Sequence, residues 1–360
     1  MKKPTRNVRI LKSKVISRVT GMSLWLIATY SVVSAQLSAQ SVDDPSGVSM
    51  ALATQAPVPV SPQTTSAAAV WLDKLRTNLR TLNYRISFVV SRTNGESEPY
   101  LWRHGSQDGL EMEHLSVLNG PGREAFRIGN VVSIFEPDVQ PYSLRSNYIN
   151  GPIPQQFFKA PELLNNAYNM VLVGRSRISG LAAQQIRIIS RDKSRYSFTA
   201  WLDQDSGLLL KLDMLDLDGK LIEQIQVTSL HISDEPDAYF SRIEREKLPE
   251  INRIVSHPPV LHQWQINWLP KGMNLIKRDV HTLPVTGDVV DYVLLSDGMV
   301  DVSVYMHKIK GSLVDSGWLQ HHSTTLLSLN NGDVEVTVVG KIPVATANSI
   351  ASSIRPRDPE

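Results

Sequence analysis

Seven arginines lie on or near segments whose alternating apolar pattern predicts β-strands between residues 120 and 200. A guanidinium group is always charged and offers five N–H donors, so such a cluster can hold a phosphate, a carboxylate or an acidic peptide. The alternative is that these side chains cover the solvated outer faces of the strands. The cluster comprises Arg123, Arg127, Arg175, Arg177, Arg187, Arg191 and Arg195.

A second candidate for binding is a strand that is apolar on both faces. Leu208–Leu210 is a run of three leucines, and Leu212 and Leu215 follow it. A sheet buried on both sides can wrap a helix or line a cavity for lipid. Ordinary core packing explains any one of these leucines as well.

Sequence templates for catalysis are not matched. Gly120–Ala125 fits the pattern G-x-G-x-x-A, but strand-like sequence follows where a helix would have to begin, so a turn is expected. There is no phosphate-binding loop, no G-x-S-x-G elbow and no cysteine. No catalytic residue is therefore expected, and the competing hypothesis is a hydrolase with an unrecognised site.

The histidines and aspartates do not have the spacing of metal ligands. His257 and His262 are separated by two prolines, and His321 and His322 are adjacent, so neither pair lies on one helix face. The aspartate-rich turn that begins at Asp213 lacks the acid that a calcium loop needs at its twelfth position. No metal and no cofactor is expected.

The candidate residues require elements to position them, and the pattern predicts an α+β fold. Apolar residues at helical spacing predict a helix over 67–82, and alternation predicts a strand over 84–90. Pro161 is expected to start a second helix that buries Leu164, Ala167, Tyr168 and Val171.

Tight turns rich in Asp and Gly then separate further alternating segments. The turns 203–207 and 216–219 join strands predicted over 195–202, 208–215 and 220–230. This pattern is typical of an antiparallel meander.

Charged residues and prolines cluster from 233 to 262, where a short helix is expected over 239–247, and a second unit follows. Its alternating strands end in a closing helix that Pro343 starts, with Val344, Ala347, Ile350, Ala351 and Ile354 on one face.

The N-terminal residues explain the net charge of +2. Residues 1–39 hold seven Lys and Arg and no acid, so the rest has 30 bases and 35 acids, a net charge near −5. This basic segment and the short apolar stretch at 22–35 predict a signal peptide that is cleaved after Ala35 or Ala39. The alternatives are an uncleaved membrane anchor and a wrongly assigned start codon. The acidic remainder gives no support for nucleic-acid binding.

Two segments carry a resemblance to a known family. They are Arg-Asp-x-x-Arg-Tyr-Ser at 191–197 and Gly-Asn-x-x-Ser-x-Phe-Glu-Pro at 129–137, and further matching stretches cover most of 67–355. The chain resembles the RseB/MucB family of periplasmic regulators of the sigma-E envelope stress response. The resemblance implies a large domain like the carriers LolA and LolB, which is an antiparallel half-barrel wrapped around helices, and a smaller domain of sheet and helix.

The resemblance also implies a function. Family members bind the periplasmic domain of an RseA-like anti-sigma factor and block its site-1 cleavage, and lipopolysaccharide or lipoprotein acyl chains release them. They also self-associate, so a dimer is expected. The predicted parts are a signal peptide (1–39), a disordered tether (40–66), the large domain (67–235), a linker (236–261) and the small domain (262–355).

Six residues are predicted to bind the partner or lipid. Three arginines would meet acidic groups, and three aromatic residues would line a cavity or an interface. They are Arg127, Arg191, Arg195, Phe135, Tyr142 and Trp201. The alternative function is a periplasmic carrier of lipid or lipoprotein, which would have no need of the second domain.

Overall fold

The computed structural model of the protein describes residues 66–93, 95–107, 109–251, 264–282, 289–309 and 316–357. The predicted signal peptide, almost all of the predicted tether, His257 and His262 lie outside these residues. Among the helices of the described part, none is long and apolar enough to cross a membrane.

Helix α2 (Ala67–Thr81) confirms the first predicted helix. It begins where the Ser66 side chain accepts a hydrogen bond from the backbone N–H of Ala69, at 3.1 Å. This N-cap satisfies one of the N–H groups that the first turn leaves without a partner. Leu72, Leu75 and Leu79 are buried, so the apolar stripe faces the sheet.

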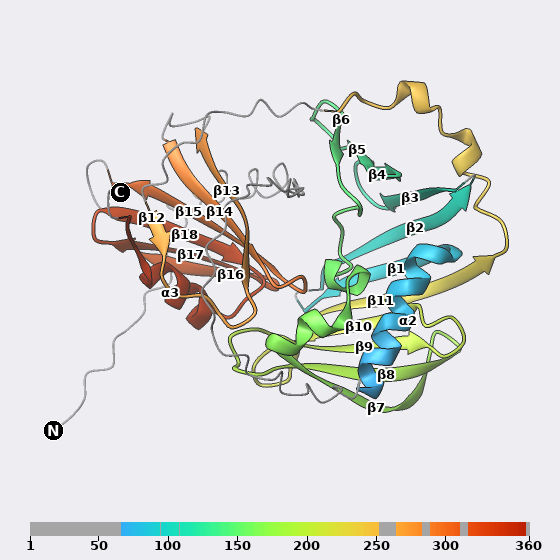
Figure 1. Ribbon diagram of the computed structural model, residues 1–360, viewed down its shortest axis with the longest axis horizontal. Coiled ribbons are helices and arrows are strands. Elements are labelled where there is room, and N and C mark those ends of the chain that lie inside the picture. Colours follow the sequence, from blue (N-terminus) through green and yellow to red (C-terminus); the bar gives the residue numbers. More distant parts are fainter. Residues whose placement is uncertain are drawn as a thin grey trace, which may run out of the picture.

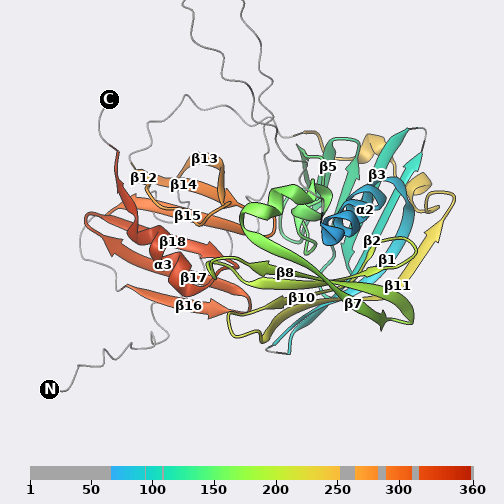
Figure 2. The same cartoon turned by 60° about the horizontal axis from the view of Figure 1, so that its bottom comes forward.

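The large domain is one antiparallel sheet of eleven strands, in the order β6-β5-β4-β3-β2-β1-β11-β10-β9-β8-β7. The sheet curves around α2 (Figures 1 and 2). This arrangement confirms the predicted antiparallel sheet wrapped around helices. The strands are β1 (Asn83–Arg92), β2 (Ser97–Gln107), β3 (Leu110–Val117), β4 (Arg123–Ile128), β5 (Val131–Phe135), β6 (Tyr142–Arg145), β7 (Tyr168–Ile178), β8 (Leu181–Ser190), β9 (Ser197–Asp203), β10 (Leu209–Leu215) and β11 (Leu221–Ser233).

Alternation places the core on the concave face of this sheet. In β1, Ile86, Phe88 and Val90 are at most 2% exposed, and they pack in one cluster with Leu75 of α2. The predicted turn at 216–219 is present: Gly219 has a φ of +82°, which glycine adopts without steric cost. The turn at 203–207 likewise joins β9 to β10.

The prediction of a helix from Pro161 is wrong in extent. The 3-10 helix η2 (Pro161–Asn166) ends early, and Tyr168 already pairs with Ser190 as the first residue of β7. Leu164 is buried as expected, whereas Val171 is 45% exposed on the edge strand. A shorter 3-10 helix, η1 (Gln155–Phe158), precedes η2.

The small domain has an antiparallel sheet of six strands in the order β13-β14-β15-β18-β17-β16, and β12 and β19 pair in a separate sheet of two strands. Helix α3 (Val344–Ser352) begins after Pro343, as predicted, and buries Ala347, Ile350 and Ala351, whereas Ile354 belongs to the strand that follows. The strands are β12 (Trp264–Ile266), β13 (Asn274–Thr282), β14 (Val289–Ser296), β15 (Asp301–Lys308), β16 (Gly317–His321), β17 (Thr324–Asn331), β18 (Val334–Gly340) and β19 (Ile354–Pro356).

Residues 234–251 follow β11 and run back across the sheet to β6 (Figure 1). In place of the one short helix expected over 239–247, they contain two 3-10 turns, η3 (Phe240–Arg242) and η4 (Arg245–Lys247).

Candidate binding site at the domain seam

A cavity of about 600 Å³ lies where the two domains meet. The large domain supplies apolar side chains from β9, β10 and β11, and the small domain supplies them from β13, β14, the β14–β15 turn and β18. A mainly apolar cavity of this size with a few polar groups is typical of a ligand site. Its apolar lining includes Phe198, Leu212, Met214, Ile225, Leu275, Ile276, Leu294, Met299 and Val339.

A second cavity, of about 370 Å³, lies on the concave side of strands β1 to β6. It shares a wall with the seam cavity, because residues 150–152, Tyr148, Glu223 and Lys341 line both. The two cavities are therefore neighbours that one chain segment and one ion pair separate.

That ion pair joins the domains. Glu223 of β11 accepts from Lys341 Nζ at 2.6 Å and from Ser323 Oγ at 3.0 Å, and both of these groups belong to the small domain. Burial by itself would raise the pKa of Glu223. The Lys341 ammonium and the Ser323 hydroxyl outweigh burial and hold this pKa below its ordinary value. Glu223 therefore remains a carboxylate between the two cavities.

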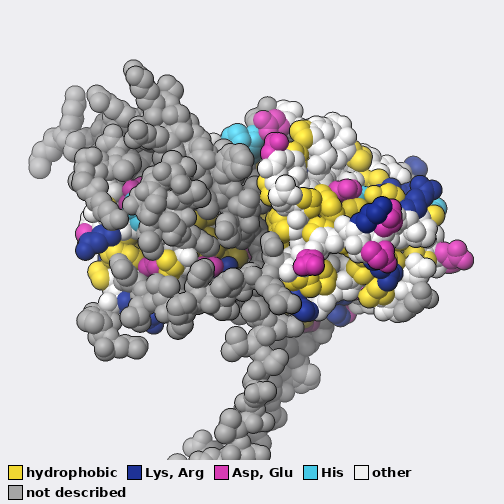
Figure 3. All heavy atoms as spheres, turned by 90° about the horizontal axis from the view of Figure 1, so that it is seen from above, with side chains coloured by type: hydrophobic (Ala, Val, Ile, Leu, Met, Phe, Trp, Pro, Cys, Tyr) yellow, Lys and Arg dark blue, Asp and Glu magenta, His cyan; other side chains and the backbone are white. Residues whose placement is uncertain are grey.

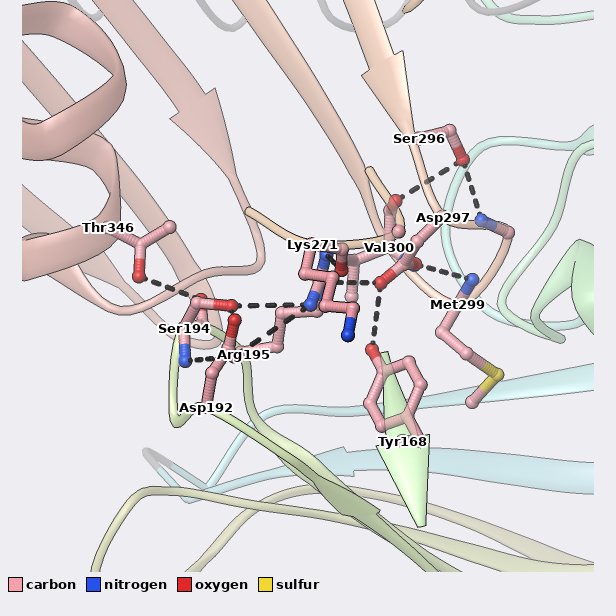
Figure 4. Close-up of polar contacts among 12 residues, drawn as sticks. Tyr168, Asp192, Ser194, Arg195, Lys271, Ser296, Asp297, Met299, Val300 and Thr346 are labelled. Atoms are coloured by element: carbon pink, nitrogen blue, oxygen red, sulfur yellow. Dashed lines mark hydrogen bonds and ion pairs between the residues drawn. The ribbon is translucent and has the colours of Figure 1, made fainter. Parts of the chain in front are cut away.

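A second interdomain contact is centred on Arg195, in the β8–β9 turn (Figure 4). Its Nε lies 2.6 Å from Oδ2 of Asp297, in the β14–β15 turn, and its Nη2 donates to the backbone oxygen of Lys271 at 2.6 Å. Tyr168 Oη donates to the same Asp297 oxygen at 3.0 Å. Arg195 is 0% exposed, so the guanidinium is enclosed by its partners.

Asp297 also shapes its own turn. Its Oδ1 accepts from the backbone N–H groups of Met299 and Val300, each at 2.9 Å. Burial raises the pKa of Asp297 above its ordinary value even though Arg195 and these donors act in the opposite direction. The carboxylate thus fixes the turn of the small domain and receives the arginine of the large one.

Further contacts across the seam involve backbone groups. Thr346 Oγ1 of α3 donates to the Ser194 backbone oxygen at 2.7 Å, and the Gln156 N–H donates to the Gly298 oxygen at 2.9 Å. The seam is thus a packed interface with a cavity inside it.

The arginines predicted to bind a partner lie in three different environments. Arg191 is exposed, and its Nε donates to the Tyr168 backbone oxygen at 3.1 Å. Arg195 is held in the seam, as described above. Arg127 is 2% exposed and forms ion pairs with Glu111 and Glu113 inside the half-barrel. Arg127 and Arg195 therefore do not offer a guanidinium group to a partner or lipid, because carboxylates of this chain already pair with both.

The three predicted aromatic residues are also separated. Phe135 and Tyr142 are among the residues that line the 370 Å³ cavity, and their role in binding stays a prediction. Trp201 is half-buried on β9, and Lys211 Nζ lies 4.5 Å from the centre of its ring. The structure thus brings Phe135 and Tyr142 together and leaves Trp201 and Arg191 elsewhere.

Of the residues that form the polar contacts of the seam, only Arg195 was predicted from the sequence as a binding residue. Asp297, Glu223 and Lys341 carried no signal of their own in the sequence, and Tyr168 was expected only as a buried residue of a helix. The only local sign was Asp297-Gly298 between two alternating segments, which indicates a hairpin turn. Their importance depends on partners more than 100 positions away along the chain.

The described residues contain no group of His, Asp or Glu side chains that could hold a metal ion. Within the described part of the chain, two sheet domains enclose a seam cavity, and buried polar contacts join the two domains. This arrangement is typical of a two-domain binding protein. Residues 67–252 match the MucB/RseB N-terminal domain model, and residues 259–355 match the MucB/RseB C-terminal domain model. The chain belongs to the MucB/RseB family.

Named relatives are regulatory proteins. The chain is 31% identical to sigma-E factor regulatory protein RseB of Haemophilus influenzae over 79% of this chain and 90% of that protein. It is 29% identical to RseB of Escherichia coli over 81% of this chain and 91% of that protein. It is also 29% identical to sigma factor AlgU regulatory protein MucB of Pseudomonas aeruginosa, over 80% and 91% respectively.

Solved structures show the same architecture. The complex structure of Pseudomonas aeruginosa MucA/MucB gives a TM-score of 0.67 at 29% identity and covers 82% of this chain and 100% of that chain. MucB in complex with MucA(peri) gives 0.65 at 29% identity and covers 81% and 100%. In these structures the relative is bound to MucA.

Proposed function

We propose that this protein is a periplasmic regulator that binds the periplasmic region of an RseA- or MucA-like anti-sigma factor and shields it from site-1 proteolysis. The observation that carries the proposal is the cavity enclosed by both domains, in a fold whose relative is found in complex with MucA. A segment of the partner bound in the seam would be inaccessible to a protease. The protein acts by binding and needs no catalytic residue.

Lipopolysaccharide or the acyl chains of lipoproteins are the proposed releasing signals. The apolar walls of the two neighbouring cavities can accept an acyl chain, and Lys341 lies in the wall between them. A ligand releases the partner only if it binds better to the free protein than to the complex. If the acyl chain and the partner bind to the same apolar walls, the acyl chain binds to the free protein and not to the complex, so this condition is met.

One face of the large domain offers apolar surface to a partner. Viewed from above, hydrophobic side chains gather over the large domain with only scattered charges among them (Figure 3). The proposed contacts with the partner or the lipid are Arg191, Phe135, Tyr142 and Trp201. We also propose that the protein is a dimer and that the N-terminal signal peptide directs its export.

The test is a cleavage assay with a site-1 protease and the periplasmic segment of the anti-sigma factor. Addition of this protein should slow cleavage, and lipopolysaccharide should restore it. Cleavage at an unchanged rate, with the protein shown to be folded, would reject the regulatory role. Recovery of lipoproteins but no anti-sigma factor from envelope extract would instead favour the carrier function.

A further inference from the structure

Residues 234–248, which we call the strap, lie on the outer face of the large sheet, opposite the side that holds α2. Asn83 Nδ2 donates to the Asp234 backbone oxygen at 2.8 Å and fixes the start of the strap beside β1. Beyond its end, Ser143 Oγ donates to the Pro249 oxygen at 2.7 Å, beside β6. The strap is thus held at both ends, and its middle depends on side-chain contacts with β2, β3 and β4 and on an ion pair of Asp237 with Arg85 of β1.

Tyr239 provides the central contact. Its ring is stacked on the His114 ring, with the centroids 4.7 Å apart, and the Arg103 guanidinium carbon lies 4.3 Å from the Tyr239 centroid. On its other side, His114 stacks on Phe126 at 4.4 Å. The neighbouring Phe240 is 4% exposed. The strap is therefore attached through a short aromatic stack that Arg103 borders.

The protonation state of His114 follows from its partners. Arg103 Nη1 lies 2.9 Å from His114 Nδ1, and His114 Nε2 lies 3.0 Å from Glu124 Oε2. An arginine can only donate, so Nδ1 must accept and carries no proton. Nε2 then carries the proton and donates to Glu124. The stack contains a neutral histidine that bridges a cation and an anion.

Charged groups face His114 from three elements. They are Arg103 of β2, Glu124 of β4 and, in the strap, Asp237, which pairs with Arg103 Nε at 3.3 Å. The phenol of Tyr239 has a raised pKa because of burial, and it stays neutral. Burial and then Arg103 lower the pKa of His114 below its ordinary value of 6.5, against the opposing effect of Glu124 and Asp237.

We propose that His114 is a proton-operated latch that fastens the strap to the sheet. Protonation of Nδ1 removes the acceptor of Arg103 and directs a second N–H toward the guanidinium, which disrupts the stack under Tyr239. The attachment is complete above about pH 6.5, where His114 is neutral in both states, and weakens as pH falls through the lower pKa of the attached state. This device is independent of the proposed regulatory function.

The test is hydrogen–deuterium exchange of the full chain, followed in peptides from the strap and corrected for the intrinsic effect of pH. Between about pH 7.5 and pH 5, exchange in the strap should rise about threefold to tenfold, because one proton changes the opening constant at most tenfold per pH unit. Peptides from β9 and β10 should keep their protection. Strap exchange that does not change with pH would overturn the proposal.

Three variants separate the latch from general acid effects. His114→Asn keeps an acceptor for Arg103 and cannot be protonated, so its strap exchange should not change with pH. His307→Asn removes a histidine that contacts Glu335 in the small domain, and it should behave like the unsubstituted chain. Tyr239→Ala should release the strap at neutral pH. A pH response that persists in His114→Asn would overturn the assignment of the latch.

Discussion

Arg195 and Asp297 join the two domains through a buried ion pair, with Nε and Oδ2 2.6 Å apart and neither side chain more than 2% exposed. Arg195 lies in a turn of the large sheet and Asp297 in a turn of the small one. The pair can form only when the turn of the large sheet and the turn of the small sheet lie next to each other. It therefore defines one arrangement of the domains and places the walls of the seam cavity opposite each other.

Replacement of Asp297 by Asn should destabilise the protein strongly. The change leaves the Arg195 guanidinium buried without its counter-ion, and loss of one partner from a buried pair costs about 3–5 kcal/mol. Urea unfolding should show this loss in the free energy of unfolding. Arg191→Ala is the matched control: Arg191 is exposed four positions away, and we expect a change within about 0.5 kcal/mol.

The double variant Arg195→Met with Asp297→Asn completes the test, because Asn keeps an acceptor for the backbone N–H groups of Met299 and Val300. It removes both buried charges, so it should be more stable than Asp297→Asn alone. If Asp297→Asn and Arg191→Ala have the same stability as the unsubstituted chain, the ion pair does not hold the domains together.

A second prediction concerns acid stability. Burial acts to raise the pKa of Glu111, but hydrogen bonds from His104 and Arg127 lower it to about 2, from an ordinary value of 4.5. A carboxylate with a lowered pKa in the folded state contributes stability above about pH 4.5 and loses it as pH falls toward 2. The free energy of unfolding should therefore decrease over this interval.

Arg127→Met should flatten this acid-dependent decrease and lower stability at neutral pH by about 3–5 kcal/mol, because Glu113 is left buried without its partner. Arg123→Met, which removes the exposed pair with Glu98, should cost less than about 1 kcal/mol. A steep acid dependence that survives in Arg127→Met would contradict this account of Glu111.

The sequence alone was enough to predict the strands with one buried face. Alternation in β1 and the glycine in the turn at 216–219 are local signals, and each corresponds to an observed element. The segment after Pro161 shows the limit of this method. Leu164, Ala167 and Tyr168 have helical spacing, yet Tyr168 pairs in β7, because a short apolar run fits either period and the neighbouring strand decides.

The site was less predictable for a related reason. Arg195 stands in a polar stretch that is typical of a solvated turn, and only the fold brings Asp297 of the other domain against it. Phe135 of β5 and Tyr142 of β6 lie on neighbouring strands of one sheet and line the same cavity, and their part in binding stays a prediction. Pairing across domains leaves no comparable periodic signal in the sequence.

The final prediction tests whether the seam cavity binds the partner. Leu294→Trp adds a large side chain to the cavity wall, from a half-buried position on β14. If the partner occupies this cavity, its affinity should fall at least tenfold, or about 1.4 kcal/mol, in calorimetry with the periplasmic segment of the anti-sigma factor. Protection from site-1 cleavage should fall in parallel.

Leu181→Trp makes the same substitution at an exposed position on β8, outside both cavities, and should leave affinity unchanged. Both variants should keep the melting temperature of the unsubstituted chain within a few degrees, which shows that any loss of binding is local. If a folded Leu294→Trp binds the anti-sigma segment normally but loses lipopolysaccharide, the cavity belongs to the lipid alone. Unchanged binding of both ligands would exclude the seam cavity as either site.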